Sequence, residues 1–162
     1  MSGLILFTLF HVVLSVMAIS LGLVTVYGLI NGRRMGRLTA WFLAFTAATT
    51  ITGFLFPFHG FTPALGVGII STLLLVLAVV ARYRFAMAGR WRAIYITSAI
   101  TALYLNCFVF VVQSFQKIPV LHAFAPDGSG PVFAGVQAVV LLSFTVVGYA
   151  AVKRFRGELA TG

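Results

Sequence analysis

Acidic residues are almost absent from this chain, which has two of them in 162 residues against eleven lysines and arginines. Both acids, Asp127 and Glu158, lie outside the long apolar runs, and no lysine or arginine occurs within those runs. Ion-coupled carriers, proton pumps and voltage sensors need charged side chains inside the membrane. The sequence therefore argues against these three classes.

Charged residues of either sign make up only 8% of the chain, and 61% of it is hydrophobic. A water-soluble domain needs far more charge than this. Five apolar runs are long enough to cross a bilayer core of about 30 Å: residues 4–30, 38–56, 63–81, 93–115 and 132–152. These runs lack the alternation of barrel strands. We therefore predict an all-α membrane protein, in which residues 1–162 form one domain, a five-transmembrane-helix bundle.

The basic residues are distributed unequally between the connections. Lys117 stands alone between the fourth and fifth runs. The other ten flank the opposite ends of the runs: Arg33, Arg34, Arg37, Arg82, Arg84, Arg90, Arg92, Lys153, Arg154 and Arg156. This asymmetry predicts an N-terminus outside the cell and a cytoplasmic C-terminus. It also predicts attraction to anionic lipid head groups at the cytoplasmic face, and does not favour nucleic acid as a partner.

Catalytic motifs are missing as well. The chain has a single cysteine, Cys107, so it cannot form an intrachain disulfide. It has no HExxH, CxxC or GxSxG motif, and no glycine loop that could hold a phosphate before a helix. No base with an orienting group can be assembled near its serines and threonines. We therefore expect no enzymatic activity.

The run at residues 93–115 carries more polar side chains than any other. In hydrocarbon such groups need partners within the protein, so we predict that this helix faces the interior of the bundle. The polar residues that could bind a ligand are Ser98, Tyr104, Asn106 and Gln113, with Gln137 at a similar depth in the last run. The simpler interpretation is that the amides fix the helix register. The alternative is a small outward-opening cavity for a neutral ligand such as a quinone, lipid or isoprenoid.

Small residues predict where helices approach closely. Ala18 and Gly22 lie one turn apart in the first run. The second run has a small residue at every fourth position: Ala40, Ala44, Ala48 and Thr52. We expect both stripes to pack tightly against neighbouring helices of the same chain.

The three histidines all fall toward the predicted outer side. His11 lies in the first run, and His59 and His122 lie in the two outer connections, the second of which also holds Asp127. Imidazoles with a carboxylate could bind zinc or copper, or supply axial ligands to haem. Their spacing is not diagnostic, so the simpler interpretation is that they are ordinary polar residues. We expect no cofactor, with haem or a transition metal as the alternative.

Several short segments suggest a family. They are Phe56-Pro57-Phe58, Val67-Gly68-Ile69-Ile70, Gly89-Arg90-Trp91-Arg92, Leu103-Tyr104-Leu105-Asn106, Val111-Val112-Gln113, Pro119 and Ala125-Pro126. With these segments the chain resembles, over roughly residues 52–150, a group of small bacterial multi-pass membrane proteins that have no known activity. The group has an acidic, proline-paired stretch after the Ala-Pro, where this chain has Asp127-Gly128-Ser129-Gly130-Pro131. The resemblance implies a bacterial inner-membrane location and no functional residues.

These observations favour a non-enzymatic integral membrane protein that acts by binding. It would be an accessory or assembly subunit of a membrane complex, or a binder of a hydrophobic ligand. The alternative is a metal- or haem-binding redox protein that uses the outer histidines. A third possibility is an oligomeric pore for neutral solutes. The expected partners are the lipid bilayer and either another membrane protein or further copies of this chain.

Overall fold

The computed structural model describes residues 3–57 and 60–155, and all regular structure within them is helical. The helices are α1 (Gly3–Ile30), α2 (Gly36–Phe54), α3 (Pro63–Val79), α4 (Arg90–Lys117), α5 (Pro119–His122) and α6 (Pro131–Arg154). A π-helical turn, η1 (Val80–Arg84), continues α3 without a break. The prediction of an all-α protein is thus confirmed for the described residues.

Within the described residues, four helical segments are long and apolar enough to cross a membrane: α1, α3 with η1, α4 and α6. They correspond to four of the five predicted runs and are compatible with a multi-pass membrane protein. The run predicted at residues 38–56 forms α2. This helix is not apolar enough to be counted with the other four. Five threonines and Arg37 lower its hydropathy.

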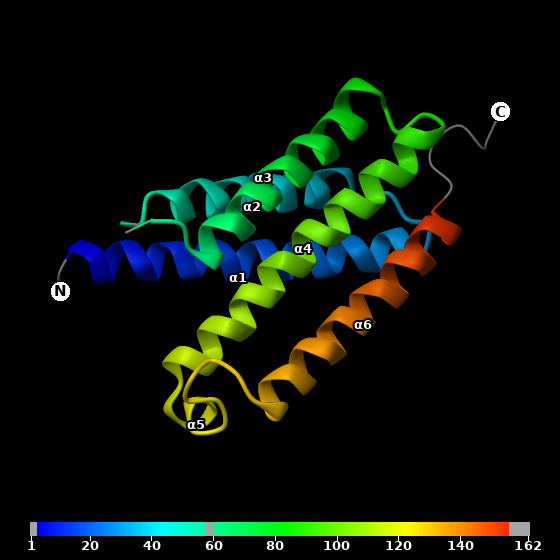
Figure 1. The fold of residues 1–162 in the computed structure, drawn as a ribbon. Coiled ribbons are helices and arrows are strands. Elements are labelled where there is room, and N and C mark those ends of the chain that lie inside the picture. The colour runs from blue at the N-terminus through cyan, green and yellow to red at the C-terminus, as the bar shows by residue number, and fades with distance from the viewer. Residues whose placement is uncertain (1–2, 58–59, 156–162) are drawn as a thin grey trace.

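The helix α4 lies at the centre of the bundle, as its polar content predicts. It contacts α1, α2, α3 and α6, whereas α1 packs most extensively against α2. In Figure 1, α1 and α2 run side by side, and α4 crosses them with α3 and α6 beside it. Buried residues make up 39% of the most apolar stretch of α4, against 6% in α6. The helix α6 is therefore the least enclosed of the long helices.

Helix α1 approaches α2 and α4 closely at Gly22. A Cβ atom on this glycine would lie 2.5 Å from Leu103 Cδ1 and 2.8 Å from Phe42 Cε2. Leu103 and Phe42 are at most 1% exposed, so both side chains that face Gly22 are fully buried. The prediction of tight packing at Ala18 and Gly22 is confirmed, since both are buried.

The helix α2 buries a different face from the predicted one. Ala40 and Ala44 are exposed, and Ala48 is half-buried. The buried residues of α2 are Thr39, Phe42, Leu43, Thr46, Thr49 and Thr52. The expectation for the alanine stripe was therefore wrong except at Thr52. Threonine is also small enough for close helix contact, and its hydroxyl can bond to its own helix, as Thr52 Oγ1 does to the Ala48 carbonyl at 2.8 Å.

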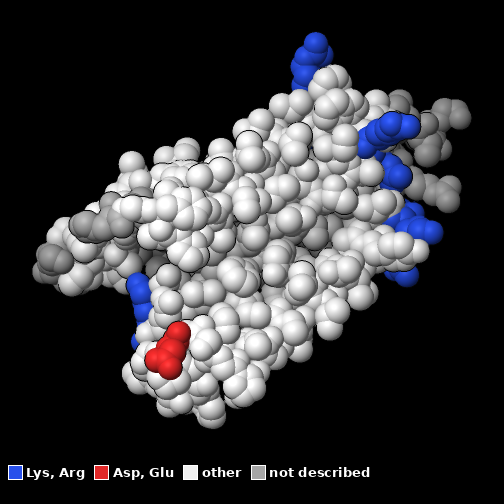
Figure 2. Space-filling model, in the orientation of Figure 1, with Lys and Arg blue, Asp and Glu red and all other residues white. Residues whose placement is uncertain are grey.

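One end of the molecule is strongly basic. Figure 2 shows lysine and arginine side chains gathered at the end where α1, η1 and α6 finish and where α2 and α4 begin. This basic end holds Arg33 and Arg34 after α1, Arg82 and Arg84 in η1, and Arg90 and Arg92 in the first turn of α4. The predicted Arg156 lies outside the described residues. Lys117 is at the other end, in the last turn of α4.

Arg92 ties two helices together at the basic end. Its Nη1 donates to the Val152 carbonyl of α6 at 3.0 Å, and also to the Phe155 carbonyl just beyond that helix. The last carbonyls of a helix have no partner within the helix, and a cation stabilises them. Arg92 therefore caps α6 and fixes Phe155, which is 3% exposed.

Candidate functional site

The histidines proposed as metal ligands are not brought together in the part of the chain that the structure describes. His11 Nδ1 is 2.8 Å from Thr52 Oγ1, and its imidazole packs edge-on against Phe56. His122 is exposed on α5, which contacts only α4 among the described helices. Asp127 is exposed in the connection that follows α5. His59 lies outside the described residues, within which no three His, Cys, Asp or Glu side chains form a metal site.

The polar residues proposed to bind a ligand have separate surroundings. Ser98 is buried, and Gln113 is exposed. Asn106 Nδ2 is buried without a hydrogen-bond partner among the described residues. Gln137 Nε2 donates to the Phe108 carbonyl of α4 at 3.2 Å, so this amide links α6 to α4. The remaining residue, Tyr104, lies in a groove.

This α4–α6 groove has a volume of about 300 Å³. Its lining is Thr97, Ile100, Thr101, Tyr104, Leu141, Phe144, Thr145, Gly148 and Tyr149. The Tyr104 ring is 5.9 Å from that of Phe144 and 6.2 Å from that of Phe108, measured between centroids. Hydroxyl groups and aromatic rings therefore share one surface between two otherwise apolar helices. The predicted Ser98, Asn106, Gln113 and Gln137 are not part of this lining.

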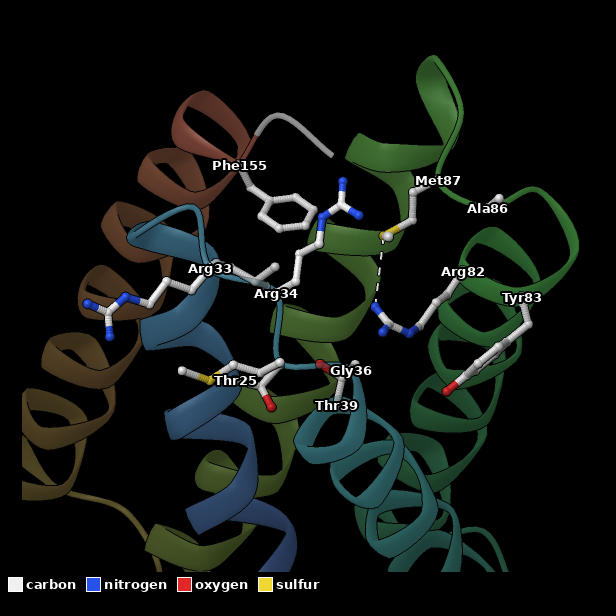
Figure 3. Close-up of a pocket in the computed structure, with 12 residues that line it drawn as sticks. Thr25, Arg33, Arg34, Gly36, Thr39, Arg82, Tyr83, Ala86, Met87 and Phe155 are labelled. Atoms are coloured by element: carbon white, nitrogen blue, oxygen red, sulfur yellow. Dashed lines mark hydrogen bonds between the residues drawn. The ribbon is translucent and has the colours of Figure 1, made fainter. Parts of the chain in front are cut away.

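A second hollow opens at the basic end and is lined by residues of α1, α2 and η1. This basic pocket has a volume of about 250 Å³. Its polar lining is Thr25, Arg33, Arg34, Thr39, Arg82 and Tyr83, and its other walls include Leu29, Met35, Met87 and Phe155. Figure 3 shows the Arg34 and Arg82 guanidinium groups directed into the space beside Phe155 and Met87, whereas Arg33 extends away.

Arg82 is held in the basic pocket by weak contacts. Its guanidinium carbon lies 5.5 Å from the centre of the Tyr95 ring and 5.6 Å from that of Tyr83. Its Nη1 is 4.0 Å from Met87 Sδ, which is the dashed contact in Figure 3. The Tyr95 hydroxyl faces Thr39 and Arg82 but forms a regular hydrogen bond with neither. The pocket thus contains a cation whose described neighbours are rings, a thioether and hydroxyls.

The basic pocket was not anticipated from the sequence, in which the arginines oriented the helices and predicted a general attraction to anionic lipid head groups. The pairing of Arg82 with Tyr83 at the end of a long apolar run was the available signal. The second part of that signal was a pair of threonines, Thr25 and Thr39, which lie near the same end of the first and second runs.

No family model, curated protein sequence or solved structure matches this chain. Its function therefore has to be inferred from the chemistry of its residues.

Proposed function

We propose that the chain is a five-span integral protein of a bacterial cytoplasmic membrane that binds a neutral hydrophobic ligand in the α4–α6 groove. The fifth span is α2. Its 19 residues correspond to about 28 Å, close to the thickness of a bilayer core. The helix also lies side by side with α1, which is itself apolar enough to span. A span enclosed by neighbours tolerates threonines that would be costly against lipid.

The grouping of basic side chains at one end supports an orientation with that end in the cytoplasm. In a Cys107→Ser background, we expect Ser129→Cys to react with a membrane-impermeant maleimide on intact bacteria. Ala88→Cys, in the connection at the basic end, should react only after the membrane is permeabilised. Both positions are exposed, so access to the reagent decides the result. Labelling of Ala88→Cys alone on intact cells would reverse the proposed orientation.

The observation that carries the binding proposal is the composition of the α4–α6 groove. The hydroxyls of Thr97 and Thr145 already donate to carbonyls of their own helices, both at 2.8 Å. Tyr104, by contrast, makes no hydrogen bond within the described residues, and its ring is only half-buried. It can offer a donor and an aromatic face to a neutral ligand that enters from the bilayer. Such a ligand has a ring or carbonyl head on an apolar tail, as quinones do.

Replacing Tyr104 by leucine is therefore expected to weaken ligand binding about tenfold, through loss of one hydrogen bond and one ring contact. The dissociation constant of decylubiquinone would be measured by calorimetry on protein purified in a neutral detergent. Tyr27→Leu is the matched control, because Tyr27 is an exposed tyrosine of α1 outside the groove. Equal affinities in the two variants would remove the groove as the binding site.

A further inference from the structure

We infer that the basic pocket is a second binding site and that it takes a phosphate-type anion. This inference is independent of the α4–α6 groove, which has different lining residues. It depends on three features of the pocket: an arginine without a counter-ion among the described residues, a buried hydroxyl group without a partner there, and a strained wall.

Arg82 has no carboxylate partner among the described residues. The only described acid is Asp127, and it lies in the connection between α5 and α6 at the other end of the molecule. The Arg82 Nε is buried and has no hydrogen-bond partner in the described structure. A partly buried guanidinium is costly unless an anion or several acceptors meet its N–H groups. Arg34 already takes part in another interaction, so the argument is made on Arg82.

Two buried hydroxyl groups are unpaired as well, one in the lining of the pocket and one beside Arg82. Thr25 lines the pocket, is 2% exposed, and its Oγ1 has no hydrogen-bond partner within the described residues. Tyr95 is fully buried beside Arg82, and its hydroxyl is likewise unpaired in that part of the chain. Buried polar groups are nearly always hydrogen-bonded, so an unpaired hydroxyl in the wall of a cavity indicates a missing partner. Since Arg82 and the Thr25 hydroxyl both line the pocket and both supply donors, an acceptor with several oxygens fits them.

The wall of the pocket is built at a conformational cost. Ala86 and Met87 both line it, and both have positive φ angles, 47° and 56°. Residues other than glycine rarely adopt this region, and strain of this kind concentrates at ligand sites. Arg82 itself sits in η1, and short π-helical segments are also frequent at functional sites.

The position of the pocket suits the head-group layer of a membrane. Tyr83 lines it and Trp91 lies in the first turn of α4 at the same basic end, where aromatic side chains mark the interface. A guanidinium matches the geometry of phosphate and can bind two of its oxygens at once. The anion can therefore come from two sources with the same chemistry: the phosphate of an anionic lipid, or free phosphate in the adjoining water.

The test uses Trp91 as a reporter. Its ring stacks on Phe85, with centroids 3.9 Å apart, and Ala86 and Met87 lie between these two residues in the chain. A Trp41→Phe background leaves Trp91 as the only tryptophan. Full-length protein in a neutral detergent would be titrated with sodium phosphate against sodium chloride at equal ionic strength. A second arm would use mixed micelles of short-chain phosphatidic acid, with phosphatidylcholine for comparison.

We expect a saturable change of Trp91 fluorescence with phosphatidic acid, with free phosphate, or with both, and the responding arm identifies the source. Arg82→Gln should weaken this binding at least about tenfold, because it removes a charge-assisted contact. Arg84→Gln is the matched control, since it removes the same charge from an exposed position of η1 outside the pocket.

Three results would overturn the inference: no saturable response in either arm, an equal response to phosphatidylcholine, or equal weakening by Arg82→Gln and Arg84→Gln. Thr25→Val keeps the shape of the side chain and removes only its hydroxyl group. It should weaken binding severalfold. If Arg82→Gln does not fold, unchanged affinity in Thr25→Val overturns the inference on its own.

Discussion

Substitution of Gly22 by leucine is expected to lower the free energy of unfolding by about 2–3 kcal/mol, the upper range for adding side-chain volume to a packed core. Even the first added carbon would be 2.5 Å from Leu103 Cδ1 and 2.8 Å from Phe42 Cε2. Both partners belong to the buried core cluster, so moving either side chain aside would disturb its other core contacts. Helix α1 would have to shift outward from both neighbours. The effect is measured as a shift in the midpoint of thermal unfolding in detergent. Unfolding is monitored by the loss of monodisperse protein.

Gly135→Leu is the control for this substitution. Gly135 is also a glycine within a long helix, but a Cβ atom there would have no atom within 4 Å. Leucine is a better helix former than glycine by somewhat less than about 1 kcal/mol. We therefore expect Gly135→Leu to leave stability unchanged or to raise it slightly. A fall as large as that of Gly22→Leu would mean that side-chain bulk in any helix, not the three-helix contact, causes the loss.

The behaviour expected at Gly22 also shows how far the sequence defines the packing. Small residues one turn apart predict that something approaches α1 closely, and this is observed. The identity of the partners, Phe42 and Leu103, cannot be read from the pattern, because each helix has several faces of similar composition. On α2 this ambiguity produced the wrong face. Alanine and threonine are both small, and it is the threonine face that is buried.

The central position of α4 was predictable for a physical reason. Uncompensated polar groups are costly in lipid, so the run that carries most of them belongs inside. The candidate sites were harder to predict by the same reasoning. Tyr104 was singled out, but its groove partners Thr145 and Tyr149 depend on which helix packs beside α4. The basic pocket combines Thr25, Thr39 and Arg82 from three elements, and no spacing along the chain relates them.

Arginines at the basic end have at least two structural roles beyond orientation. Arg82 lines the basic pocket, and Arg92 caps α6 through the Val152 and Phe155 carbonyls. Phe155 forms another wall of the same pocket. The cap therefore connects the attachment of α6 to the shape of the pocket. Loss of Arg92 should disturb both, whereas loss of an exposed arginine should disturb neither.

Replacing Arg92 by alanine is expected to lower the free energy of unfolding by about 2 kcal/mol, the range for a hydrogen bond to a charged group. The loss falls on α6, for which Ala151 is the one residue buried among those described. Hydrogen exchange of the amides in the last two turns of α6 should become faster before that of α4. Mass spectrometry of peptides from the two helices would measure the difference.

Arg90→Ala provides the control. It removes the same charge from the same turn of α4, and Arg90 is exposed. Its effect should stay within about 0.5 kcal/mol, as for other surface substitutions. Arg92→Lys should give an intermediate loss, since a single ammonium group replaces the planar guanidinium that reaches both carbonyls. If Arg90→Ala loosened α6 as much as Arg92→Ala, then the density of positive charge at this end, and not the capping contact, would hold the helix in place.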